Sequence, residues 1–255
     1  MGDSFEEMFG EIVGYGSQAT VYAKGESAVK LYREGYPKRN VFSEAYIMGE
    51  LETMNFPSPK IYEVLLVNGR YGLRMERVWG KNIGEAGMDL AQIESVLDVI
   101  VDLQCRLHKY ENTGWAPNLK QRLHDDLDRN TRLCVDLKKK LLGLLEGLPD
   151  GVALCHCDFH AGNVFSCGDK YMIVDVLQIS RGDPTGDVVC SYVSYYLYNQ
   201  ELGEEYLKRY CKKARISREK VLQWLPVYAG TLLGQMPEQY TPTIERLIAG
   251  NEAIR

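Results

Sequence analysis

The sequence contains no long apolar run. None of its hydrophobic stretches approaches the roughly 20 residues that a membrane-spanning helix needs, so no membrane partner is expected. The first residues lack the basic and apolar segments of an export signal, and Glu6 stands where a myristoylation signal has Ser or Thr. An excess of basic charge is also missing, because the formal net charge is −5 and nucleic-acid binders usually carry a basic face. These absences predict a cytoplasmic protein that binds no nucleic acid.

Cysteine is present but forms no recognisable framework. The count of seven is odd and the spacing is irregular, which favours free thiols in a reducing compartment. A zinc site at Cys155, His156, Cys157 and His160 is the alternative. Structural zinc sites use two ligand pairs that are far apart in sequence, with two to four residues inside each pair, and the Cys-x-Cys spacing here does not match. The cysteines are at positions 105, 134, 155, 157, 167, 190 and 211.

Short strand-like runs fill the first part of the chain. A chain of 255 residues suits one large domain or two lobes. Helical spacing of Val41, Ala45, Met48 and Leu51 predicts a helix over 39–54. The turn Asn68-Gly69 predicts a hairpin, because this dipeptide favours the tight turn between two strands. The predicted strands cover 11–13, 20–23, 28–32, 61–67 and 71–78.

The pattern becomes helical after Trp79-Gly80. Apolar residues repeat at helical spacing through the segments near 90–107 and 118–147, and helices are expected again from Pro184 onward. Between them the chain returns briefly to strands, at 152–155, 164–165 and 171–174. The whole predicts an α+β fold in two parts: a sheet-containing lobe of residues 1–78 and a helical lobe of residues 79–255, with a hinge at 76–84.

A glycine-containing turn precedes a strand lysine. Gly14, Gly16 and Ser17 lie between two predicted strands, where small residues let backbone N–H groups approach phosphates. Lys30 ends the run Ala-Val-Lys and can reach the α- and β-phosphates of a nucleotide. Glu44 on the predicted helix can pair with Lys30. Each feature alone is also compatible with an ordinary hairpin and surface charges.

The segment from His156 to Asn163 carries the strongest signal. Asp158 can accept a hydrogen bond from a substrate hydroxyl, and Asn163, five residues later, offers an oxygen of the kind that Mg²⁺ prefers. Asp175 ends an apolar strand, where an unpaired charge is unfavourable. A metal ion or a structural salt bridge would relieve that charge.

These residues resemble the aminoglycoside phosphotransferase and choline kinase superfamily, which has a protein kinase-like bilobal fold. The pattern is His-x-Asp-x-His-x-x-Asn at 156–163, then Asp175, then Gly-Asp-Pro-x-x-Asp at 182–187. The resemblance spans roughly 10–190. It departs at Cys157, where the family often has Gly, at Val176, where an aromatic residue is common, and at Ala19.

The resemblance implies a role for each matching residue. Asp158 is expected to be the catalytic base, and Asn163 and Asp175 are expected to hold Mg²⁺. Lys30, fixed by Glu44, is expected to bind the phosphates of ATP or GTP. The adenine is expected against the backbone of the hinge, at Met75, Glu76, Arg77 and Val78.

The resemblance further implies supporting roles and narrows the substrate class. His156, His160 and Asp187 are expected to support the site, and Asp183 with Pro184 is expected to begin a helix. His160 matches small-molecule kinases, since protein kinases usually carry Lys at that position.

The acceptor site is the least determined. Asp125, Asp126 and Asp128 could bind a cationic substrate, or could form a solvated acidic face. Tyr195, in a cluster of tyrosines, could contact an amine by cation–π attraction, or could pack in the core.

We therefore expect an ATP-dependent phosphotransferase that acts on a small-molecule hydroxyl, such as an aminoglycoside, a choline-like amino alcohol or a sugar-like metabolite. A kinase acting on a polypeptide and a catalytically silent nucleotide-binding protein are the alternatives. The sequence does not determine the oligomeric state.

Overall fold

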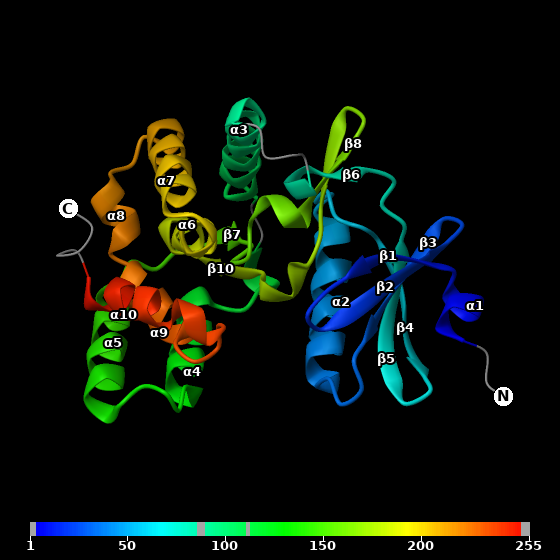
Figure 1. Cartoon of the computed structure of the whole chain (residues 1–255), viewed down its shortest axis with the longest axis horizontal. Coiled ribbons are helices and arrows are strands. Elements are labelled where there is room, and N and C mark those ends of the chain that lie inside the picture. Colours follow the sequence, from blue (N-terminus) through cyan, green and yellow to red (C-terminus); the bar gives the residue numbers. More distant parts are fainter. Residues whose placement is uncertain (1–3, 86–89, 111–112, 251–255) are drawn as a thin grey trace. The chain divides into compact units, whose positions relative to one another are not determined.

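The computed structural model describes residues 4–85, 90–110 and 113–250. The chain forms two compact units, which are described separately (Figure 1). Unit 1 comprises residues 1–86 and 162–177, and unit 2 comprises 87–161 and 178–255. The division therefore differs from the expected boundary at residue 78, because the segment 162–177 returns to the first unit.

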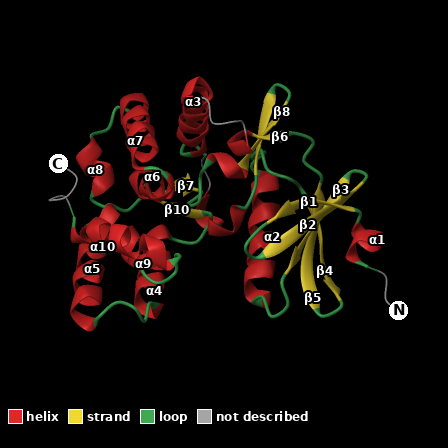
Figure 2. Cartoon of the chain, in the orientation of Figure 1, coloured by secondary structure: helices red, strands yellow, loops and turns green. Residues whose placement is uncertain are grey.

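Unit 1 is built on a five-stranded antiparallel sheet with the order β1-β2-β3-β5-β4. The hairpin between β4 and β5 confirms the Asn68-Gly69 prediction, since both turn residues have positive φ, at 49° and 77°. Figure 2 shows the strands in yellow. They are β1 Glu11–Tyr15, β2 Ala19–Lys24, β3 Ser27–Tyr32, β4 Ile61–Val67 and β5 Arg70–Glu76.

Strand β3 directs alternate side chains to the two faces of this sheet. Val29 and Leu31 belong to a buried cluster with Phe9 of the short helix α1 (Phe5–Phe9). Lys30 and Tyr32 point to the other face, where helix α2 (Lys38–Thr53) packs against β4 and β5. The alternation therefore turns a charged side chain toward α2.

A second, three-stranded sheet completes unit 1, with the order β6-β8-β9. Strand β6 (Lys81–Asn82) pairs with β8 (Val164–Cys167), which pairs with β9 (Lys170–Ile173). This pairing is the reason why 162–177 groups with the first part of the chain. Neither α1 nor β6 is among the predicted elements. The short 3₁₀ segments are η1 Ile83–Glu85, η3 Ala161–Asn163 and η4 Val176–Gln178.

Unit 2 is helical around a two-stranded sheet of β7 and β10. Helix α6 lies at its centre and packs against β7, α7, α8 and α9. Helix α6 begins at Asp183, whose side chain accepts from the Thr185 N–H at 2.8 Å, with Pro184 in the first turn. The helices are α3 Leu90–Leu107, α4 Leu119–Arg129, α5 Val135–Gly147, α6 Pro184–Tyr198, α7 Gln200–Ala214, α8 Arg218–Leu222, α9 Leu225–Leu232 and α10 Thr241–Ala249. The remaining elements are β7 Ala153–Cys155, β10 Ser180–Gly182, η2 Thr113–Trp115 and η5 Glu238–Tyr240.

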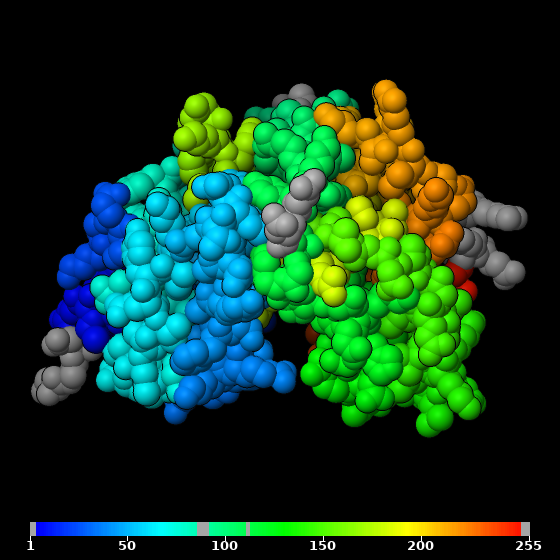
Figure 3. Space-filling model, turned by 180° about the vertical axis from the view of Figure 1, so that it is seen from behind, coloured from blue at the N-terminus to red at the C-terminus, as the bar shows by residue number. Residues whose placement is uncertain are grey.

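The apolar residues at helical spacing over 118–147 do not belong to one continuous helix. The structure contains two helices, α4 and α5, which form much of the green surface in Figure 3. The buried Asn130 interrupts them, because its amide donates to the carbonyl oxygens of Gly230 and Leu233 at 3.0 and 2.9 Å. A side chain that bonds backbone groups in this way competes with helix continuation.

Gly186, inside the Gly-Asp-Pro-x-x-Asp segment, is explained by packing. A Cβ on Gly186 would lie 2.7 Å from Leu119 Cδ2 and 3.2 Å from the Trp224 ring. Leu119 and Trp224 are both fully buried. Glycine at position 186 therefore lets α6 approach α4 closely. Among the helices of the described segments, none combines the length and apolar character needed to cross a membrane.

Candidate active site

Three charged side chains of unit 1 meet at Lys30. The Lys30 ammonium lies 2.7 Å from Glu44 Oε1 and 2.9 Å from Asp175 Oδ1. Glu44 is on the inner face of α2, and its side chain is only 3% exposed. The structure thus forms the predicted ion pair with Glu44, not with Glu52, whose Oε1 accepts instead from the Ile61 N–H.

The neighbours of Lys30 fix its charge. Burial alone would lower the pKa of Lys30, but the carboxylates of Glu44 and Asp175 outweigh burial and raise that pKa above its ordinary value. The other oxygen of Glu44 accepts from the Tyr32 hydroxyl at 2.5 Å. Burial, followed by the Glu44 charge, raises the pKa of Tyr32, so Tyr32 remains a neutral donor. Lys30 is therefore a cation held in one position.

The β8–β9 hairpin brings Asn163 close to Asp175. Val164 pairs with Ile173, and the next residues along the two strands remain bonded, with the Val174 N–H donating to the Asn163 carbonyl oxygen at 2.9 Å. Asp175 has a φ of 59°, in the left-handed region, and its side chain is 49% exposed. Carboxylate and amide oxygens are suitable ligands for Mg²⁺, which usually keeps several waters and takes few protein ligands. These two residues therefore fit the ion that the sequence implied.

The glycine turn joins β1 to β2. The Gly16 N–H donates to the Ala19 carbonyl oxygen at 2.8 Å, which closes the turn that contains Ser17 and Gln18. A Cβ on Gly14 would make only ordinary contacts, 3.7 Å from Val21 Cβ. The hairpin itself therefore does not require glycine at position 14.

The predicted hinge follows β5 in unit 1. Met75 pairs with Ala28 and Ile61, Glu76 pairs with Ser27, and Val78 lies in the extended segment after the strand. Arg77 forms an ion pair with Glu11 at 2.8 Å. These residues thus connect β5, an inner strand of the sheet, to β6.

The catalytic loop candidate follows β7 in unit 2. Asp158 and His160 are both partly exposed, and His160 Nε2 lies 3.6 Å from Asp158 Oδ1. Between them Phe159 is fully buried and packs edge-on against the buried His156. The side chains of His156 and Phe159 are therefore buried in unit 2, whereas that of Asp158 is partly exposed to solvent.

Asp187 fastens this loop from the first turns of α6. Its Oδ1 accepts from the Cys157 N–H at 2.5 Å, and its Oδ2 lies 2.8 Å from His108 Nε2 and 2.7 Å from Gln104 Nε2. Burial would raise the pKa of Asp187, but the hydrogen bonds from His108, Gln104 and Cys157 outweigh burial and lower it. Asp187 is therefore ionised and fully buried.

Cys157 adopts a φ of 63°. The left-handed region is unfavourable for residues with a Cβ by about 1–2 kcal/mol. This backbone conformation gives a physical reason for the glycine that the resembled family often has at this position.

Tyr195 packs in the core, which is one of the two roles that the sequence left open for it. It is buried in unit 2, and its hydroxyl accepts from the Ala161 N–H at 3.0 Å. Burial raises the pKa of Tyr195, whereas the Ala161 N–H lowers it. Tyr195 therefore supports the loop that carries Asp158, and offers no exposed aromatic face to an amine.

Two of the three acidic residues of α4 have a side-chain partner on the same helix. Asp125 accepts from Gln121 at 2.8 Å, and Asp126 pairs with Arg129 at 2.9 Å. Asp125 and Asp128 are exposed. The part of the chain that the structure describes contains no group of three or more His, Cys, Asp or Glu side chains arranged to hold a metal ion, so the zinc alternative has no support.

Sequence reasoning missed Gln104, His108 and Arg122. Gln104 is fully buried, and it shares the inner face of α3 with the apolar residues Leu97, Ile100 and Val101. A polar residue at helical spacing on an apolar face was the available signal for a buried hydrogen-bond network. Arg122 gave no comparable signal.

The sequence profile of the phosphotransferase enzyme family matches residues 13–224. The chain belongs to this family. The comparison with curated proteins found no match.

Several solved structures share the fold of this phosphotransferase family member. A thermostable mutant of the aminoglycoside phosphotransferase APH(4)-Ia, in complex with ADP and hygromycin B, is 12% identical, with a TM-score of 0.67 over 97% of this chain and 98% of that chain. Choline kinase LicA from Streptococcus pneumoniae is 15% identical, with a TM-score of 0.64 over 92% and 90%. A choline/ethanolamine kinase family protein from Mesorhizobium loti is 17% identical, with a TM-score of 0.62 over 95% and 88%. At these identities the likeness establishes the kinase-like α+β fold.

Proposed function

We propose that the protein is an ATP- or GTP-dependent phosphotransferase that moves the γ-phosphate to a hydroxyl group of a small molecule. The observation that carries the proposal is the Lys30 ammonium, held between Glu44 and Asp175 at 2.7 and 2.9 Å. A cation fixed in this way is suited to bind nucleotide phosphates. The family match over 13–224 supports the reaction class.

The residues of unit 1 are assigned to the nucleotide. Lys30 would bind the phosphates, with Glu44 and Tyr32 fixing its direction. Gly14, Gly16 and Ser17 would present the turn to the phosphates, and contacts within the hairpin do not require glycine at position 14. Met75, Glu76 and Val78 would bind the base. Asn163 and Asp175 would hold Mg²⁺, which neutralises phosphate charge when it is bound.

Asp158 is assigned to the acceptor. Its carboxylate would accept the hydrogen bond of the attacking hydroxyl and aim the oxygen along the axis of transfer. Asp187 would keep Asp158 in place by bonding the backbone one residue earlier. Phosphoryl transfer needs positioning and charge stabilisation more than covalent catalysis, and the arrangement of both units is suited to that division.

The test uses two variants with opposite expectations. Asp158→Asn should abolish phosphoryl transfer while Mg-ATP still raises the melting temperature, whereas Lys30→Met should weaken that thermal shift. An acceptor screen with aminoglycosides, choline, ethanolamine and sugars supplies the substrates. Undiminished turnover by the Asp158→Asn variant would contradict the assignment. Nucleotide binding without any ATP turnover by the wild type would favour a silent binding protein.

A further inference from the structure

Arg122 of α4 is a partly buried cation whose guanidinium makes no ion pair with a carboxylate of the described residues. Its Nη1 donates to the Gln178 backbone oxygen and to Gln178 Oε1, the latter at 2.9 Å. Its Nε is buried and has no hydrogen-bond partner in the described part of the chain. A sequestered charge without a counter-ion is unfavourable, so this position calls for an explanation.

Strand register places Arg122 beside the loop that carries Asp158. Ser180 pairs with Cys155 in the antiparallel β10–β7 sheet. At this end of the sheet the chain leaves β7 toward Cys157 and Asp158, and it enters β10 after Gln178 of η4. Because Arg122 is bonded to Gln178, its guanidinium lies at the same end of this sheet as Asp158. Helix α4 also packs directly against β10.

Tyr228 of α9 connects the two charges. Burial is the main cause that raises the pKa of the Tyr228 hydroxyl; the Asp158 charge raises it further, and the Arg122 charge lowers it. Helix α9 packs against both α4 and α6. Asp158, Tyr228 and Arg122 therefore belong to one neighbourhood of unit 2, in which Tyr228 is a neutral phenol and Arg122 supplies positive charge.

Nearby acidic residues do not neutralise Arg122 directly. Asp126 is one helical turn away on α4, but its carboxylate bonds Arg129 at 2.9 Å. Asp125, bonded to Gln121, is on the exposed side of the helix. The neighbourhood of Asp158 within unit 2 is thus not the acidic surface that a polycationic acceptor would require.

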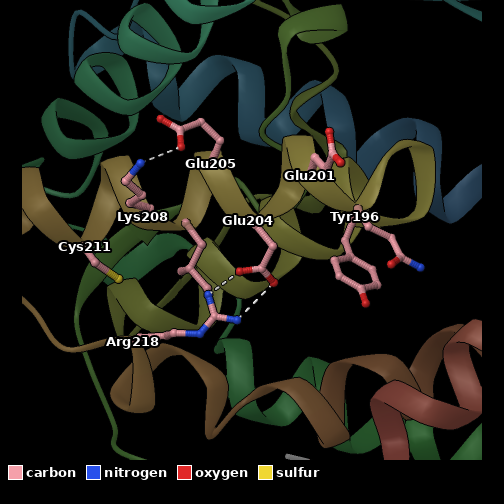
Figure 4. A pocket seen from close by; sticks show the side chains of 9 residues that line it. Tyr196, Glu201, Glu204, Glu205, Lys208, Cys211 and Arg218 are labelled. Atoms are coloured by element: carbon pink, nitrogen blue, oxygen red, sulfur yellow. Dashed lines mark hydrogen bonds and ion pairs between the residues drawn. The ribbon is translucent and has the colours of Figure 1, made fainter. Parts of the chain in front are cut away.

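A pocket elsewhere in unit 2 provides a contrast. Figure 4 shows this cavity of about 720 Å³, which helices α6, α7 and α8 line. Its two basic side chains are both paired with carboxylates: Arg218 donates to Glu204 at 2.6 and 3.0 Å, and Lys208 lies 3.0 Å from Glu205. Those pairs leave neither of the two cations available to recognise an anionic ligand.

We infer that Arg122 is a specificity residue that binds an anionic oxygen group, a carboxylate or a phosphate, on the acceptor whose hydroxyl meets Asp158. Nη1 is already used by Gln178 and Nε is buried, so Nη2 is the nitrogen that would bind an oxygen of such a group in a charge-assisted hydrogen bond. The inference rests on the proposed function and narrows its substrate class to hydroxylated anions. It argues against aminoglycosides and choline as acceptors.

The test compares acceptors of different charge, with one small and one larger compound in each charge class. The carboxylates are glycerate and gluconate, the phosphates are glycerol 3-phosphate and glucose 6-phosphate, the neutral compounds are glycerol and glucose, and the cations are choline and glucosamine. For wild type, kcat/KM should be highest for an anionic member, and the better of the two anionic classes identifies the group. Arg122→Gln should raise the KM of that acceptor about 10- to 100-fold, with the KM for Mg-ATP unchanged.

Two further variants separate recognition from support of the fold. Arg122→Lys keeps the positive charge but replaces the planar guanidinium with an ammonium group, and should give an intermediate KM for the anionic acceptor. Arg129→Gln removes a guanidinium that already pairs with Asp126 on the same helix, and should change the KM less than twofold. If Arg122 only anchors Gln178, then Arg122→Gln will lower kcat equally for every acceptor and lower the melting temperature, and the inference is wrong.

A binding measurement decides the case in which no probe is phosphorylated. Calorimetric titration of the same eight compounds, with a non-hydrolysable nucleotide present, should then detect an anionic compound that Arg122→Gln no longer binds. That result would support the inference although the proposed transfer reaction had failed. A preference of the wild type for neutral or cationic acceptors, or the absence of anion binding, would overturn the inference while leaving any observed phosphoryl transfer intact.

Discussion

The carboxylate of Asp187 accepts the backbone N–H of Cys157 at 2.5 Å, and Cys157 is the residue directly before Asp158. Asp187 is fully buried, with His108 and Gln104 bonded to its other oxygen. One carboxylate thus connects α6, α3 and the loop of the proposed catalytic residue. A substitution of Asp187 is therefore expected both to lower the stability of unit 2 and to displace Asp158.

Neutralising Asp187 should disturb both properties. In Asp187→Asn the amide cannot accept from all three donors, so we expect a loss of about 3 kcal/mol in the free energy of unfolding, as for other broken buried charge contacts. The kcat should fall more than the KM for ATP, because the nucleotide residues belong to unit 1. Urea unfolding and steady-state kinetics measure the two effects.

Asp183→Asn is the matched control, since Asn caps a helix about as well as Asp. It changes a carboxylate four residues away, at the start of the same helix. A loss of stability for Asp183→Asn as large as that for Asp187→Asn would contradict the role given to Asp187.

The same carboxylate predicts a pH dependence. The folded pKa of Asp187 lies below its ordinary value of 3.8, because its hydrogen bonds outweigh burial. A group with a depressed folded pKa stabilises the protein above its unfolded pKa, and this contribution is lost as the pH falls through the folded pKa. On acidification from pH 6 to pH 3, which crosses the ordinary carboxyl value of 3.8, wild type should therefore lose more stability than Asp187→Asn. Parallel urea midpoints at each pH would show this, and equal slopes for the two proteins would refute it.

Position 157 should tolerate glycine better than a β-branched residue. Cys157 has a φ of 63° but is also buried. Cys157→Gly relieves the backbone and loses packing, so its net effect on the unfolding free energy should stay within about 1 kcal/mol. Cys157→Val should destabilise by about 2 kcal/mol or more, since a β-branched residue in this region is an outlier. Thermal unfolding of both variants checks the order, and a more stable Val variant would contradict it.

Local patterns predicted the elements of unit 1 well, and long-range contacts explain what they missed. Alternation along β3 and helical spacing along α2 were sufficient to direct Lys30 and Glu44 toward each other. Asn130 separates α4 from α5, because its amide bonds Gly230 and Leu233, about a hundred residues later. A local sequence pattern carries no information about partners so far away along the chain.

The candidate site shows the same limit. The motif at 156–163 located Asp158 and Asn163 along the chain, whereas the groups that hold the loop come from other helices. Gln104 lies in the last turn of α3, His108 directly follows that helix, and Arg122 lies on α4. Their relation to the loop depends on helix packing, which follows from the whole core and not from any single window.

Tyr195 offers a test between a supporting role and an acceptor role. Its hydroxyl accepts the Ala161 N–H at 3.0 Å, and the side chain is 8% exposed. Tyr195→Phe leaves that buried N–H without its acceptor, which should cost about 1–3 kcal/mol of stability. The kcat should fall as the loop loosens, while the KM for the acceptor stays within twofold, because the phenol does not reach the substrate. Tyr196→Phe, the next residue on α6, is the control and should behave as wild type in both measurements. If Tyr195→Phe instead raised the acceptor KM with unchanged stability, Tyr195 would be a substrate contact, and its place in the interior would have to open during turnover.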